Sequence, residues 1–367
     1  MLEGGKINTR QAIALMVTMV LPTAFLFVTS VTGHLAKQDG WISLLLSIFT
    51  ALLIGWVAVN LSLRFPGKTL FQYVELILGR WLGKFVAFLY VLWYIHINAL
   101  IIREYGSFLV AAFMPETPIS VFMLLILAIS AYAVRNGLEV FTRVNEIIFP
   151  LILVTVIVTS ALATPEMDLK RLQPVFVENG PVPILKAAFM PAAWMSEIVM
   201  LAVLSPYLTQ IKDGYKIAAT STLITGTFLI ISFVGGIATF GPEVIGGWLF
   251  PALNSVRVIH LANFLERLEV TVMVVWVAGA LVKISVFYWA AVLGSAQWLE
   301  LKDYRPLVLP VGIILFATSI MLHDSILDLF VFLGTAWPPF ALTTFQGGFL
   351  LLLLAAAIIR GKVGKRK

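Results

Sequence analysis

The chain has 367 residues, of which 60% are hydrophobic and only 12% are charged, and its mean hydropathy is +0.99. A water-soluble domain carries about 25% charged residues and needs a polar surface. The composition therefore excludes a cytosolic enzyme, a nucleic-acid-binding domain and a disordered chain. The net charge of +6 indicates no nucleic-acid partner, because basic residues at the ends of apolar segments set the orientation of a membrane protein.

Ten apolar segments are long enough to cross a membrane, since a spanning helix needs about 20 mostly apolar residues. We expect an all-α, polytopic protein that forms one integral membrane domain over residues 1–367. Two further segments, 69–78 and 325–336, predict amphipathic helices at the membrane interface. The predicted spans are 11–35, 41–63, 84–113, 118–134, 143–162, 184–208, 216–240, 267–294, 306–322 and 338–360.

The basic residues favour one side of the membrane. If the N-terminus is cytoplasmic, 17 of the 25 Lys and Arg residues fall inside and two, Arg103 and Lys283, lie within spans. This bias predicts that both termini are cytoplasmic and that residues 361–367 form a basic tail that touches anionic lipid. The six that fall outside are Lys37, Lys170, Arg171, Lys186, Arg257 and Arg267.

A polar break over residues 162–183 divides the ten spans into five and five. Because five is odd, a second copy of the first half has to sit upside down, which is the inverted repeat of many secondary transporters. The repeats are predicted at 11–162 and 184–360. The first span of each half carries a proline near its middle, Pro22 and Pro191.

The two prolines predict broken helices that face one another. Proline lacks an N–H group and clashes with the carbonyl four residues back, and freed backbone groups inside a bilayer cost several kcal/mol each. A buried polar ligand can satisfy them, so the matched pair favours a midplane pocket for a small zwitterion. The alternative is that Pro22 and Pro191 only kink packed helices.

Glu197 is the strongest candidate for a functional residue, because a carboxylate inside a membrane is expensive to bury. It could accept a proton, pair with a ligand ammonium or bridge the unwound backbone; the alternative is a structural hydrogen bond. In the span 84–113, Tyr94, Asn98 and Ile101 share one helical face and could line the pocket. Arg103 and Glu104 lie on different faces and could gate its entrance, or simply pack between helices.

Residues 242–263 leave two interpretations open. The segment could be a lid over a pocket or a belt anchored at the interface by Trp248. No nucleophile–base pair, metal-ligand set or phosphate loop is visible, so we expect no enzyme, no metal and no cofactor.

An ordered set of short motifs resembles the B subunit of the nutrient-germinant receptors of endospore-forming bacteria. The set comprises Asn8-Thr9-Arg10-Gln11, Gln38-Asp39-Gly40-Trp41, Phe65-Pro66-Gly67-Lys68, Leu78-Gly79-Arg80-Trp81, Arg143-Val144-Asn145-Glu146 and Lys283-Ile284-Ser285.

The resemblance implies membership of the amino acid–polyamine–organocation superfamily, with a LeuT-like fold of ten helices in which helices 1 and 6 are broken. It also implies a place in the inner membrane of the spore and partners in the receptor's A and C subunits. Folds of this kind hold a coupling cation between helices 1 and 8, so Lys283, beside Ser285, could replace that ion; the alternative is a lysine that snorkels to the surface. One departure is the absence of glycine from the stretch 19–24, which narrows the approach to the backbone.

The predicted function is the sensing of a nutrient, with an amino acid as the leading class, at a site between helices 1, 3, 6 and 8. The alternatives are a proton-coupled amino acid transporter that works through Glu197 and an ion-conducting subunit. Glu197, Lys283 and Ser285 are the predicted coupling residues. The predicted ligand-binding residues are Leu21, Pro22, Thr23, Ala24, Tyr94, Asn98, Ile101, Pro191, Ala193, Trp194, Ser196, Glu197 and Trp276.

Overall fold

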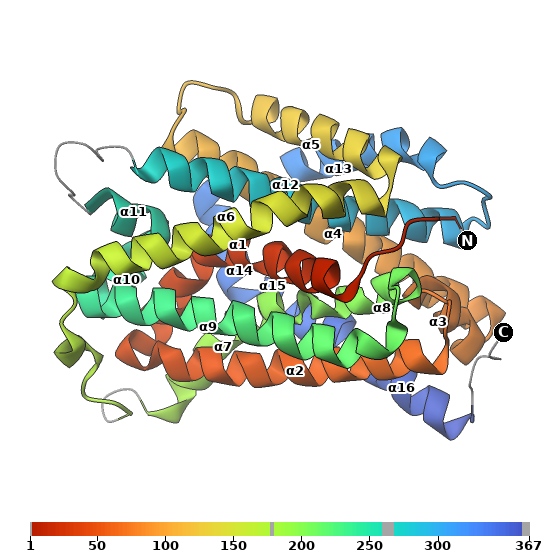
Figure 1. The fold of residues 1–367 in the computed structure, drawn as a ribbon, viewed down its shortest axis with the longest axis horizontal. Helices are drawn as coiled ribbons and strands as arrows, with labels where there is room; N and C mark the ends of the chain where they lie inside the picture. Colours follow the sequence, from red (N-terminus) through yellow and green to blue (C-terminus); the bar gives the residue numbers. More distant parts are fainter. Residues whose placement is uncertain (1, 177–179, 259–267, 362–367) are drawn as a thin grey trace.

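The computed structural model describes residues 2–176, 180–258 and 268–361. Its long helices lie side by side along the longest axis of the molecule (Figure 1). The helices are α1 (Thr9–Ala36), α2 (Gly40–Arg64), α3 (Leu70–Leu78), α4 (Arg80–Ala112), α5 (Ile119–Asn136), α6 (Leu138–Ala163), α7 (Pro181–Met195), α8 (Leu201–Leu204), α9 (Gly214–Phe240), α10 (Pro242–Gly247), α11 (Pro251–Val258), α12 (Leu268–Trp298), α13 (Val308–Met321), α14 (Ile326–Thr335), α15 (Trp337–Phe340) and α16 (Gly348–Ile359).

Within the described ranges, eight helical stretches are long and apolar enough to cross a membrane. The count is nine if α13 and α14, which meet at a 98° bend, form one span. The first stretch, Thr9–Arg64, has 56 residues and contains both α1 and α2, and α9 packs against both of them (Figure 1). The structure therefore confirms an all-α polytopic membrane protein.

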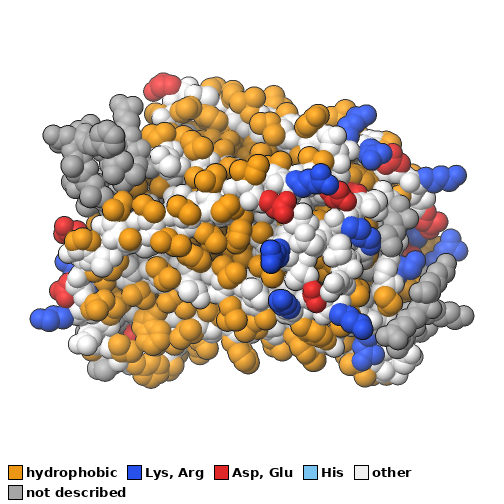
Figure 2. Space-filling view, in the orientation of Figure 1, with side chains coloured by type: hydrophobic (Ala, Val, Ile, Leu, Met, Phe, Trp, Pro, Cys, Tyr) orange, Lys and Arg blue, Asp and Glu red, His pale blue; other side chains and the backbone are white. Residues whose placement is uncertain are grey.

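Apolar side chains cover the middle of the bundle, and Lys and Arg gather toward the end where α1 begins (Figure 2). The start of α1 and the end of α16 lie at this same end (Figure 1). Such a charge-poor belt matches the hydrocarbon core of a bilayer. Residues 362–367 of the predicted basic tail lie outside the described residues.

The prediction that helix 1 is broken at Pro22 is wrong, because α1 runs without interruption from Thr9 to Ala36. Nearly every residue from Ala12 to Gly33 is buried, and neighbouring helices can compensate the backbone groups that a proline frees. In the second half, Pro191 also stays inside α7; the α-helix ends at Met195 and continues as a 3₁₀ segment, Ser196–Met200. The 3₁₀ segment therefore follows Pro191 and does not begin at it. Of the two helices predicted to be broken, only the second has such an irregular segment.

The two predicted amphipathic helices are confirmed as helices. The first, α3, begins with a capping box in which Thr69 and Gln72 each bond the other's backbone. The second, α14, begins where the Ser325 side chain accepts a hydrogen bond from the Asp328 N–H. Both caps satisfy N–H groups that a helix start leaves free.

The short helix α3 packs closely on α4 at Gly83. A Cβ atom on Gly83 would lie 2.4 Å from the Glu75 Cα atom, so Gly83→Ala is expected to lower the free energy of unfolding by about 1–3 kcal/mol through overpacking. Gly247→Ala is the matched control, because nothing lies within 4 Å of its added Cβ atom. Thermal unfolding of the purified protein measures both, and equal effects would contradict the close packing.

The segment before α1 pairs with the chain that follows α8. The Ile7 N–H donates to the Tyr207 carbonyl (2.9 Å), and the Thr209 N–H donates to the Ile7 carbonyl (2.9 Å). These bonds form a short parallel bridge between Ile7 and Leu208. They tie the start of α1 to the chain that leaves α7 and α8.

The carboxylate of Glu3 is a second attachment point of the same segment. It accepts hydrogen bonds from the N–H groups of Gly5 (2.8 Å) and Leu138 (3.1 Å). It also accepts bonds from the Trp289 Nε1–H (3.2 Å) and the Tyr304 hydroxyl (3.0 Å). Glu3 thus joins the N-terminal segment, the start of α6, the last part of α12 and the loop before α13.

Candidate functional site

A buried ion pair joins three residues that the sequence singled out. The Lys283 ammonium donates to Glu197 Oε1 (2.8 Å) and to the Thr23 hydroxyl (2.7 Å). Lys283, Glu197 and Thr23 are 1%, 4% and 1% exposed. The contact connects α12, the 3₁₀ segment after α7 and the middle of α1. The alternative that Lys283 snorkels to the surface is therefore wrong.

The irregular backbone after α7 carries the acid of this pair. Glu197 lies in the 3₁₀ segment Ser196–Met200, and a short 3₁₀ stretch inside a helix often marks a hinge or a strained sequence. Burying either charge alone would cost several kcal/mol, whereas the pair compensates much of that cost. The charges of Glu197 and Lys283 are therefore interdependent.

The predicted residues Pro22 and Trp276 are also in contact, one residue before Thr23. The Trp276 Nε1–H donates to the Pro22 carbonyl. The indole stacks on Tyr105, with ring centroids 6.0 Å apart, and lies against Phe108 at 4.3 Å. These rings close the space between α1, α4 and α12 beside the ion pair.

The remaining predicted residues of the first half lie on α1 and α4 and, within the described part of the chain, make no hydrogen bond to Lys283 or Glu197. Leu21, Ala24, Tyr94 and Ile101 are buried, and Tyr94 packs on Phe287 of α12. Asn98 donates from Nδ2 to the Ile284 carbonyl (3.3 Å).

Ser285 does not join the ion pair. Its hydroxyl donates to the Leu281 carbonyl of its own helix (2.8 Å), as serines in membrane helices commonly do.

In the second half, Pro191, Ala193, Trp194 and Ser196 are all buried. The Ala193 carbonyl accepts a hydrogen bond from Gln346 Nε2 (2.8 Å). Gln346, fully buried in the π-helical turn Ala341–Gln346, was not predicted. Its one signal in the sequence is an amide in an apolar span, where polar side chains usually face another helix.

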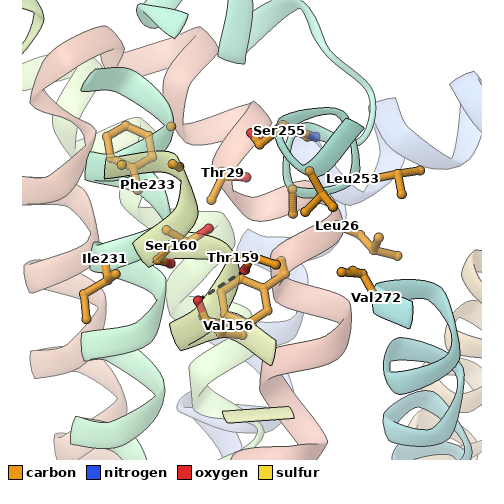
Figure 3. Close-up of a pocket in the computed structure, with 18 of the residues that line it drawn as sticks. Leu26, Thr29, Val156, Thr159, Ser160, Ile231, Phe233, Leu253, Ser255 and Val272 are labelled. Atoms are coloured by element: carbon orange, nitrogen blue, oxygen red, sulfur yellow. Dashed lines mark hydrogen bonds between the residues drawn. The ribbon is translucent and has the colours of Figure 1, made fainter. Parts of the chain in front are cut away.

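A cavity of about 120 Å³, here called the large cavity, lies beside the ion pair, toward the C-terminal half of α1. Figure 3 shows side chains from α1, α6, α9, α11 and α12 around it, including Leu26, Thr159 and Leu253. All side chains that line it are uncharged. Of the predicted ligand-binding residues, the cavity touches Pro22 and Trp276.

The inner stripe of α6 forms one wall of this cavity. Thr155, Thr159 and Ser160 line it at helical spacing; Figure 3 labels Thr159 and Ser160. The Thr159 hydroxyl bonds back to the Thr155 carbonyl of its own helix (2.8 Å), as hydroxyl side chains in membrane helices commonly do. α11, from the predicted lid segment 242–263, supplies a further wall, while residues 259–263 lie outside the described residues.

A smaller cavity of about 10 Å³ lies on the other side of the ion pair. It is lined by Met16 and Met19 of α1, by Glu197 and by Thr222 of α9, among others. The ion pair and the Trp276–Pro22 contact thus lie between two cavities. The two cavities are at opposite ends of the central part of α1.

Comparisons with known proteins agree on the fold and the family. Residues 6–325 match a family model described as spore germination protein. Spore germination protein KB of Bacillus subtilis is 26% identical over 333 residues, which cover 88% of this chain and 87% of that protein. Spore germination protein XB of Bacillus anthracis is 23% identical over 68% of this chain and 69% of its own length.

Two transporter structures share the fold. A nucleobase-cation-symport-1 family transporter, closed with bromovinylhydantoin bound, superposes with a TM-score of 0.72 at 11% identity, over 98% of this chain and 79% of its own. An outward-open Na⁺-coupled sialic acid symporter gives a TM-score of 0.66 at 12% identity, over 98% and 90%. Because the family model spans most of the sequence, this transporter-like, multi-pass membrane protein belongs to the B-subunit family of spore germination proteins.

Proposed function

We propose that this protein is the nutrient-sensing B subunit of a germinant receptor in the inner spore membrane. The nutrient, an amino acid as the leading class, binds at the junction of α1, α4, the 3₁₀ segment and α12. The observation that carries this proposal is the buried contact of Lys283 with Glu197 and Thr23. Charges inside a membrane bundle mark ligand and ion pathways more often than they stabilise the fold.

We also propose a topology of ten crossings with both termini in the cytoplasm. α1 and α2 each cross once, because their 56 residues measure about 84 Å at 1.5 Å per residue, far more than the bilayer core of about 30 Å. The bent pair of α13 and α14 supplies one further crossing, the ninth in chain order. The other seven crossings are the seven long stretches that remain. The two halves are then an inverted repeat, 11–162 and 184–360.

Lys283 takes the place of a coupling cation in this scheme. Its ammonium holds α1 and the 3₁₀ segment to α12. A ligand carboxylate competes for the Lys283 ammonium, and a ligand ammonium competes for Glu197. The ligand reaches the pair from the large cavity when Trp276 leaves the Pro22 carbonyl.

Ligand binding then changes which contacts hold α1 and the 3₁₀ segment in place. A shift of these two elements against α4 and α12 is the signal, and the A and C subunits of the receptor receive it. A ligand can shift such an equilibrium only through different contacts in the two states, and the ion pair provides those contacts.

The first experiment identifies the ligand class. A thermal-shift screen of the purified chain with the twenty amino acids, sugars and nucleosides is expected to give stabilisation by one class. Uptake of the radiolabelled hit into liposomes that contain this chain alone then separates sensing from transport. Concentrative uptake would support the proton-coupled transporter instead, and a steady ligand-gated current across a planar bilayer would support an ion-conducting subunit.

Glu197→Gln is expected to change the nutrient concentration required for germination at least tenfold, because the amide cannot neutralise an ammonium group. The amount of protein in the membrane should stay near the wild-type level, since glutamine keeps the shape and the acceptor oxygen. Spore germination and immunoblotting of the membrane fraction measure the two effects. The matched control is Glu139→Gln, an exposed acid that pairs with Arg143 at i,i+4. A collapse in protein abundance would assign Glu197 a structural role.

A further inference from the structure

A second buried carboxylate lies on the helix that packs against the helix of Lys283. Glu104, on α4, is 2% exposed, and α4 packs along α12, which carries Lys283. The Glu104 Oε1 atom has no hydrogen-bond partner among the described residues, and neither has Oε2 of Glu197. The cluster therefore contains two carboxyl groups and one ammonium group.

The cationic side chains near Glu104 are engaged elsewhere. Lys283 already bonds Glu197 and Thr23. Arg103, the next residue on α4, donates to the Ile320 carbonyl (3.3 Å). The carboxylates whose charges favour the charged Arg103 guanidinium are Asp324 and Asp328, which follow α13.

The charge balance of the cluster lacks one positive charge. With both carboxyl groups ionised, Glu104, Glu197 and Lys283 would carry a net charge of −1 in a buried site. An ionised carboxylate without a partner is far more expensive to bury than a neutral acid, and such groups take up a proton instead. Glu197 has the direct bond to Lys283, so Glu104 is the group that takes the proton.

We propose that Glu104 is a resident proton-binding site of this receptor subunit: its carboxyl group is uncharged in the folded protein and neutralises the cluster around Lys283. Proton coupling in this protein then runs through Glu104 and not through Glu197, which the sequence favoured. The role of that proton in sensing rests on the proposed function, whereas the presence of the proton does not.

Infrared spectroscopy of the full chain in lipid nanodiscs tests the proton directly, without any ligand. The wild-type protein at pH 7 is expected to show the carbonyl band of a protonated carboxyl group. Glu104→Gln should remove this band, whereas Glu116→Gln, at an exposed acid after α4, should leave it. Absence of the band in the wild-type protein, or its persistence in Glu104→Gln, would overturn the proposal.

The pH dependence of unfolding gives a second, independent readout. The folded protein holds a proton that the unfolded chain releases, so the folded state loses stability as the pH rises. The unfolding equilibrium constant of the wild-type protein should gain a factor of ten per pH unit, from about pH 5 up to the pH at which the band disappears. Unfolding of Glu104→Gln should release one proton fewer, so the equilibrium constant should rise by a tenfold smaller factor per pH unit. An unchanged slope would contradict the assignment. If Glu104→Gln fails to assemble, Glu104→Asp should shift the infrared band, and an unshifted band would overturn the proposal.

Discussion

Replacing Lys283 by methionine is expected to lower the free energy of unfolding by about 3–5 kcal/mol, the largest effect of any single substitution proposed. The substitution leaves the Glu197 carboxylate buried without its cation, and removal of one partner of a buried pair costs this much. It also removes the hydrogen bond to Thr23. Unfolding of the purified protein by heat or by denaturant measures the loss.

Two controls separate the ion pair from general damage to the core. The double substitution Glu197→Leu with Lys283→Met removes both charges and should recover most of the lost stability, because apolar replacements of buried pairs are often neutral. Lys37→Met breaks the pair with Glu243, whose side chains are 44% and 79% exposed, and should cost less than about 1 kcal/mol. If the double variant is less stable than Lys283→Met, the pair is not the source of the effect.

Glu3→Ala is expected to lower the free energy of unfolding by about 2–4 kcal/mol, because it leaves buried donors without an acceptor. The most affected are the Trp289 indole and the Leu138 N–H, on residues that are both 0% exposed, whereas the Tyr304 hydroxyl keeps the Val134 carbonyl as an acceptor. The N-terminal segment should also detach, so trypsin should cleave after Lys6 faster than in the wild-type protein. Thermal unfolding and timed proteolysis measure the two effects.

The matched controls for Glu3 are an isosteric change and an exposed acid. Glu3→Gln keeps an acceptor oxygen and should cost less than half as much as Glu3→Ala. Glu139→Ala removes an exposed carboxylate that accepts from the Lys6 N–H, and should change stability by less than about 1 kcal/mol. Equal losses in Glu3→Ala and Glu139→Ala would show that the four hydrogen bonds of Glu3 contribute little.

The sequence allowed prediction of the helices because their signals are local. Apolar length marks the spans, and the capping residues Thr69 and Ser325 mark the starts of two short helices. The state of Pro22 is not a local property, because neighbouring helices decide whether a membrane helix kinks or breaks. The prediction of a broken first helix failed for that reason.

The candidate site was predicted as a set of residues and not as a set of contacts. Glu197 and Lys283 each stood out as charges inside spans, but their side chains meet across 86 residues of sequence. The large cavity was not predicted, because it depends on how closely the inner stripe of α6 approaches α9 and α11. Hydroxyl groups such as that of Thr159 occur in many packed membrane helices, so they do not indicate an open space.

The bridge between Ile7 and the chain after Tyr207 has a mechanical consequence. It clamps the base of α1 to the far end of the strap formed by α7, the 3₁₀ segment and α8. The two arms are thus fastened at one end and linked again through Lys283, which bonds Thr23 of one arm and Glu197 of the other. A displacement of either arm near its middle must therefore tilt both arms about the bridge at Ile7, and the two arms would move as one rigid unit.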